Sequence, residues 1–109
     1  MAYDANLGDR IRRLFEQRND VVEKSMFGGI AFMLRGNMCV GVTKNDLMVR
    51  VGPDVDAMAM TDPHTKPFDM TGRPMKGWVL VEPAGVATPE SLGKWVQQGV
   101  AYAESLPPK

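Results

Sequence analysis

The sequence contains only one cysteine and one histidine, Cys39 and His64, among its 109 residues. An intrachain disulfide is therefore excluded, and so are the ordinary zinc sites built from several cysteines and histidines. Acidic and basic residues number 13 each, whereas a dedicated nucleic-acid-binding domain usually carries a basic excess. We therefore expect no metal, no other cofactor and no direct binding of nucleic acid.

No apolar run approaches the length of a membrane span, and the first ten residues lack the apolar segment of a signal peptide. A single thiol fits a reducing compartment. We therefore expect a cytoplasmic protein without membrane contact. The length of 109 residues and the apolar fraction of 44% predict a single domain over residues 1–109 with its own core.

The apolar spacing predicts elements in the order α-β-β-β-α-β-β-α. The first helix covers residues 7–24, a short helix follows Pro53, and the last helix has Thr88 as its N-cap and ends before Pro107. The expected strands are residues 30–35, 38–43, 46–51, 66–70 and 78–82. Because strands and helices do not alternate as in βαβ units, the predicted fold class is α+β. We expect two layers, with an antiparallel sheet of four to five strands packed against helices.

Two short loops set the expected strand register. Gly36-Asn37 is a good two-residue hairpin signal, and Lys44-Asn45 is a weaker one. In this register Met33 faces Val40, on the same side of the sheet as Val49. The second face then carries Ile30, Phe32, Leu34, Cys39, Gly41, Met48 and Arg50. Helices packed on one face cannot cover the other, so we expect a homodimer or another protein partner to cover it. The predicted partner-binding residues are Phe32, Leu34, Met48 and Arg50.

A second candidate site is the glycine-bounded loop that carries Arg73 and Lys76 beside Trp78. Two cations in such a loop can hold an anion or a partner's carboxylate. A tight turn with solvated charges is the simpler interpretation of the same residues.

Catalytic residues are not predicted. Cys39 lies in the middle of an apolar strand, where a cysteine usually acts as a small buried hydrophobe. His64 lies in a turn beside Pro63 and is expected at the surface. A small enzyme is the alternative hypothesis, and it would need a pocket that joins Cys39 or His64 to Arg50 or Arg73.

Three blocks of sequence carry a family resemblance. They are SMFGGIAFM (residues 25–33), DLMVRVG (46–52) and TGRPMKG (71–77). Together they resemble the N-terminal domain of the TfoX (Sxy) family, in order and over nearly the whole chain. The resemblance implies a bacterial source and a two-layer α+β fold similar to secretion chaperones and YjbR-like proteins. Family members that regulate competence genes carry a further C-terminal helical domain, which we expect this chain to lack. Our leading hypothesis is a non-enzymatic protein-interaction module, linked to bacterial transcriptional and competence regulation through a partner.

Overall fold

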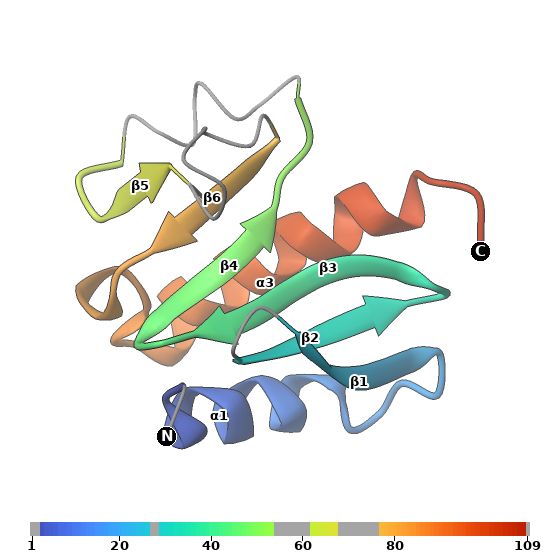
Figure 1. Cartoon of the computed structure of the whole chain (residues 1–109), viewed down its shortest axis with the longest axis horizontal. Coiled ribbons are helices and arrows are strands. Elements are labelled where there is room, and N and C mark those ends of the chain that lie inside the picture. Colours follow the sequence, from blue (N-terminus) through green and yellow to red (C-terminus); the bar gives the residue numbers. More distant parts are fainter. Residues whose placement is uncertain (1–2, 27–28, 54–61, 68–76, 109) are drawn as a thin grey trace.

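The computed structural model describes residues 3–26, 29–53, 62–67 and 77–108 (Figure 1). The strands form one sheet in the order β1-β2-β3-β4-β6-β5, and each neighbouring pair is antiparallel. The elements are α1 (Ala5–Phe15), β1 (Val21–Met26), β2 (Gly29–Leu34), β3 (Asn37–Thr43), β4 (Asp46–Arg50), β5 (Thr65–Pro67), β6 (Trp78–Val81), the 3-10 helix η1 (Pro83–Val86) and α3 (Pro89–Glu104). The predicted α+β class is confirmed, and the described residues form six strands instead of the expected four to five. The short helix expected after Pro53 falls mainly on residues outside the described part.

The additional strand comes from the segment that was predicted as the second half of the first helix. Helix α1 starts at the N-cap Asp4, whose carboxylate accepts from the amides of Asn6 and Leu7, and it ends at Phe15. Val22 lies seven residues after Phe15 and so fits the helical period, which made the helix look continuous. Its β-branched side chain, beside that of Val21, favours a strand instead, and β1 pairs with β2 along its length.

The β2–β3 turn differs from the prediction by one residue. The loop is Arg35-Gly36, with φ of 53° and 87°, and Leu34 pairs with Asn37. Two consecutive positive φ values are typical of a type I′ turn, which takes glycine well at its second position, whereas the predicted loop placed Gly36 first. Asn37 is only 2% exposed and its side-chain amide donates to the carbonyl of Pro107 at 2.9 Å. This long-range hydrogen bond holds Asn37 in the strand. The Lys44-Asn45 loop is confirmed, because Thr43 pairs with Asp46.

A β-bulge in β3 changes which side chains of β2 and β3 point to the same face of the sheet. Phe32 pairs with Val40, but Met33 pairs with Met38, so Cys39 is an extra residue opposite β2. Cys39 and Val40 consequently both belong to the main core. The predicted pairing of Met33 with Val40 is wrong for two reasons. The turn one residue earlier makes Met38 the partner of Met33, and the bulge makes Phe32 the partner of Val40.

The main core lies between one face of the sheet and the helices. Figure 1 shows α3 behind the sheet and α1 below it. Phe32 and Leu34 are 2% and 0% exposed in this core, and the ring of Phe32 lies 5.6 Å from that of Phe15 in α1. Their predicted place on the second face is therefore wrong, and that of Ile30 and Cys39 is wrong for the same reason. In the single chain Phe32 and Leu34 are not accessible to a partner.

Helix α3 begins and packs as its sequence predicts. Thr88 is the N-cap, its hydroxyl accepts from the amide of Ser91, and Pro89 occupies the first turn. The side chains that α3 buries lie at helical spacing: Leu92, Val96, Gly99, Val100 and Ala103.

The second face of the sheet has two rows of side chains. Cross-strand pairing places the first row in the order Lys24, Ala31, Gly41, Met48, Leu80 and Lys66. Val22, Met33 and Met38 form one end of the second row, and the pair Arg50 and Trp78 lies at the other. A Cβ on Gly41 would lie 2.7 Å from the methyl carbon of Met48 and 3.0 Å from that of Met38. The two thioethers therefore fill the space above this glycine, and both methionines are buried in the single chain.

Candidate functional site

The most distinctive side-chain arrangement surrounds Arg50, the last residue of β4, where the second face of the sheet meets the C-terminal part of α3. Its Cζ atom lies 5.5 Å from the ring centroid of Trp78 in β6 and 5.3 Å from that of Tyr102 in α3. All three side chains are partly exposed. We call these three residues the Arg50 cluster. Both distances are within the range of attractive cation–π contacts.

Backbone geometry fixes the two aromatic rings of the Arg50 cluster. Gly52 has φ of +94°, and a Cβ there would lie 2.6 Å from two ring carbons of Tyr102. Only glycine lets the ring pack against this backbone. The carbonyl of Gly77 accepts from the amides of Val51 at 2.9 Å and Gly52 at 3.0 Å. These bonds join the exit of β4 to the entry of β6, next to Trp78, and so hold the cluster rigidly.

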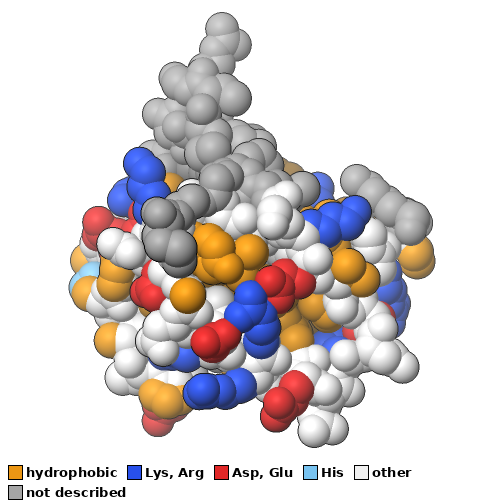
Figure 2. Space-filling view, turned by 60° about the horizontal axis from the view of Figure 1, so that its bottom comes forward, with side chains coloured by type: hydrophobic (Ala, Val, Ile, Leu, Met, Phe, Trp, Pro, Cys, Tyr) orange, Lys and Arg blue, Asp and Glu red, His pale blue; other side chains and the backbone are white. Residues whose placement is uncertain are grey.

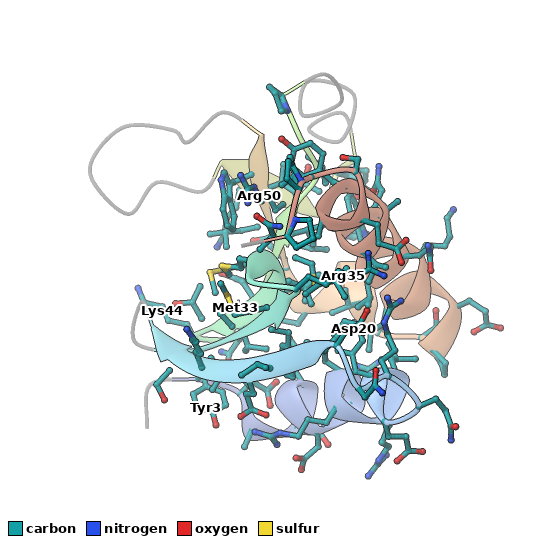
Figure 3. All side chains as sticks on the ribbon, turned by 90° about the vertical axis from the view of Figure 1, so that its right-hand side faces the viewer. Tyr3, Asp20, Met33, Arg35, Lys44 and Arg50 are labelled. Atoms are coloured by element: carbon teal, nitrogen blue, oxygen red, sulfur yellow. The ribbon has the colours of Figure 1, made fainter. Side chains whose placement is uncertain are left out.

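Arg50 has different interaction partners from three other arginines of the chain, which bind carboxylates. Arg12 donates to Glu23 at 2.7 Å, Arg18 donates to Asp20 at 2.9 Å, and Arg35 donates to Asp20 at 3.3 Å. The hydrogen bond from Arg18 is the main reason that the pKa of Asp20 falls to about 2. Figure 3 shows Arg50 apart from the Asp20–Arg35 pair. Within the described ranges, Arg50 has no ion pair or hydrogen bond.

Cys39 is buried and unreactive by its surroundings. It is 0% exposed, and its thiol donates to the carbonyl of Phe32 at 3.3 Å. Burial raises the pKa of the thiol to about 11, because the charged thiolate is poorly solvated there. A nucleophilic cysteine needs the opposite shift. The predicted role of Cys39 as a small buried hydrophobe is therefore confirmed.

His64 is half-buried and lies apart from both Cys39 and the Arg50 cluster. It borders an open groove of about 950 Å³ along the outer side of α3. The described residues that line the groove are Asp62, His64, Ala84, Gly85, Ser91, Gly93, Lys94, Trp95, Gln97, Gln98 and Ala101. The amide of Glu82 donates to the carbonyl of His64, which places His64 across β6 from the Asp46 end of β4. Arg50 ends the same strand four residues later, roughly 13 Å away along its axis. The described lining includes neither Cys39 nor Arg50.

Of the predicted site residues, Met48 and Arg50 lie on the second face as expected. Met48 is fully buried there, so Arg50 is the accessible one. Arg73 and Lys76 lie outside the described residues. Sequence reasoning did not place Trp78 and Tyr102 beside Arg50. Pairing of β4 with β6 would have brought Trp78 to Arg50, but Tyr102 lies on the flank of the α3 stripe and follows no sequence signal.

The described part of the chain contains neither a metal-binding cluster nor a membrane span. No group of three or more histidine, cysteine, aspartate or glutamate side chains there could hold a metal ion. No helix in the described segments has both the length and the apolar character to span a membrane.

A sequence model of the TfoX N-terminal domain matches residues 13–103, which is most of the 109-residue chain. The chain belongs to the TfoX N-terminal domain family. The match covers every strand of the described sheet, α3 up to Ala103 and the last residues of α1, so it includes every member of the Arg50 cluster. No curated protein and no solved structure matches the chain.

Proposed function

We propose that this domain is a non-enzymatic, cytoplasmic protein-interaction module, linked to bacterial transcriptional and competence regulation through a protein partner. The regulatory link is supported by membership of the TfoX N-terminal domain family. The interaction role rests on one observation, the partly exposed Arg50 cluster, in which Arg50 has no ion pair with another described residue. Arginine, tryptophan and tyrosine are the residue types most enriched at the energetic centres of protein interfaces.

A protein partner suits the surface better than nucleic acid does. The formal net charge is zero. Figure 2 views the molecule from the α1 side, and blue and red side chains alternate on the part of this face that is coloured. Binding to a phosphate backbone requires several cations along one surface. Some of the cations have a carboxylate partner, as in the Arg12–Glu23 pair.

The proposal is tested by comparing a cluster variant with a control of equal charge change in the native bacterium. Arg50→Glu reverses a charge in the Arg50 cluster, whereas Arg13→Glu does so at an exposed position on α1. We expect Arg50→Glu to reduce capture of the partner on tagged domain at least about tenfold, since losing a charged interface contact costs about 2 kcal/mol or more. The same variant should change competence-gene transcript levels as deletion of the gene does, and Arg13→Glu should match wild type in both measurements.

Unchanged capture and unchanged transcripts with Arg50→Glu would contradict the proposal. The variants must first give wild-type thermal unfolding. This requirement separates loss of a contact from loss of the fold.

Self-association through the second face is a narrower form of the same proposal. Val22 is 57% exposed and pairs across the strands with the partly exposed Met33. In a homodimer these residues would be covered, and sedimentation equilibrium should report a dimer that Val22→Glu disrupts. Leu14→Glu, at a 47% exposed position on α1, is the matched control and should remain dimeric. A monomeric wild type would remove the homodimer and leave a different protein as the partner.

A small-ligand role is the second candidate function, and the groove beside His64 is the observation that favours it. Pockets of this size accommodate small molecules. An anion-binding role would instead use Arg50 together with Arg73 and Lys76.

A further inference from the structure

We infer that the Arg50 cluster is a receptor for a carboxylate, supplied by an aspartate or glutamate side chain of the protein partner. This inference rests on the proposed function and names the chemistry that the partner must present. A guanidinium carries five N–H donors and cannot lose its charge in a protein. Those of Arg50 reach no acceptor in the described segments.

The aromatic rings satisfy only part of what the guanidinium requires. A cation over a ring gains from the negative π face, and Arg50 has two such contacts, at 5.3 and 5.5 Å. Neither ring offers an acceptor with the geometry of a carboxylate. The in-plane N–H groups of a guanidinium match two carboxylate oxygens at once, in a bidentate pair that is about twice as strong as a neutral hydrogen bond.

The immediate surroundings favour a carboxylate of a protein over a phosphate. A phosphate group carries up to two charges and is normally held by several cations or by a row of backbone amides. Arg50 brings a single positive charge. Met48, two residues earlier on β4, is buried, whereas Leu80, two residues after Trp78 on β6, is an apolar and partly exposed residue of the same face. An acidic side chain flanked by apolar residues complements such a surface.

The cluster is also built before a partner arrives. The Gly77 carbonyl and the positive φ of Gly52 fix the strand ends and the Tyr102 ring. A preorganised guanidinium loses little side-chain entropy on binding, so more of the interaction remains as affinity.

The isolated domain and two matched peptides test the inference without knowledge of the partner. The probes are acetyl-Leu-Glu-Leu-amide and acetyl-Leu-Gln-Leu-amide, titrated into 15N-labelled protein while the Nε–H signals of the arginines are followed by NMR. We expect the Glu peptide to bind about tenfold more tightly than the Gln peptide, in line with a charge-assisted hydrogen bond. The Arg50 signal should move toward the hydrogen-bonded position, and the Arg13 signal should stay in place.

Variants separate a binding role from a structural one. In Arg50→Gln the preference for the Glu peptide should disappear, and in Arg50→Lys, which keeps the charge and loses the planar fork, it should fall to an intermediate value. If Arg50→Gln lowers the thermal stability while the two peptides bind wild type equally, the cluster only fastens α3 to the sheet and the inference is wrong. Tighter binding of inorganic phosphate than of the Glu peptide would also overturn it. If Arg50→Glu leaves partner capture unchanged, the proposed function fails, whereas the peptide measurement still decides whether Arg50 binds a carboxylate.

Discussion

Gly99→Ala is expected to lower the free energy of unfolding by about 1–3 kcal/mol, the range for overpacking a tight contact. A Cβ at Gly99 would overlap the carbonyl oxygen of Cys39 and would lie 2.9 Å from a methyl group of Val40. The carbonyl belongs to the backbone of β3 and cannot move aside as a side-chain end can. Helix α3 would therefore have to shift away from the sheet. Urea denaturation followed by circular dichroism measures the loss.

The same helix provides the control. A Cβ at Gly93 would have no atom within 4 Å, so Gly93→Ala brings only the helix-propensity gain of about 0.5–1 kcal/mol. Opposite signs for two identical substitutions would show that the α3–β3 contact, and not helix propensity, decides the result. Equal effects at the two positions would contradict the close packing of α3 on β3.

Alkaline pH is expected to lower the free energy of unfolding, because the thiol of Cys39 is buried. Its pKa is about 11 in the folded domain and 9.0 ordinarily. Between these values the unfolded chain has lost the proton and the folded chain still holds it, so stability falls as pH rises. At about 1.4 kcal/mol per unit of pKa, the loss approaches about 2–3 kcal/mol by pH 11 and is absent below pH 9.

The measurement is the difference in unfolding free energy between wild type and Cys39→Ala at several pH values. Lysines and tyrosines also titrate in this range, but they are common to both proteins and cancel. The alanine variant should lose some stability from its smaller side chain by a constant amount and should keep the cellular function. A difference that does not change with pH would mean that the thiol ionises equally well in the folded domain.

The extent to which the sequence predicted the fold depended on how local the deciding signal was. Helix α3 was predicted at its start because Thr88 and Pro89 act within one turn. The β2–β3 register was not, because the side-chain bond from Asn37 to Pro107 and the bulge at Cys39 depend on contacts with distant residues. Strand β1 was missed because Val22 fits a helical period as well as a strand.

The candidate site followed the same rule. Arg50 was placed correctly by the alternation along β4, which is a local property. Phe32 and Leu34 were placed on the wrong face, because one extra residue in β3 reverses the relation between the two strands. Tyr102 reaches Arg50 only through the position of α3 across the sheet, and no pattern in the sequence encodes that position.

The row that crosses the second face ends in Lys24 on β1 and Lys66 on β5, the two outermost strands of the sheet. A lysine on an outer strand discourages another chain from pairing with it, because the added strand would have to accommodate a solvated charge against its backbone. Lys66 is held over the sheet by an ion pair with Asp46 at 3.0 Å, so this protection applies to the β1 border. A partner that binds this domain is consequently expected to dock side chain against side chain on the face of the sheet, and not to continue its hydrogen-bond ladder beyond β1.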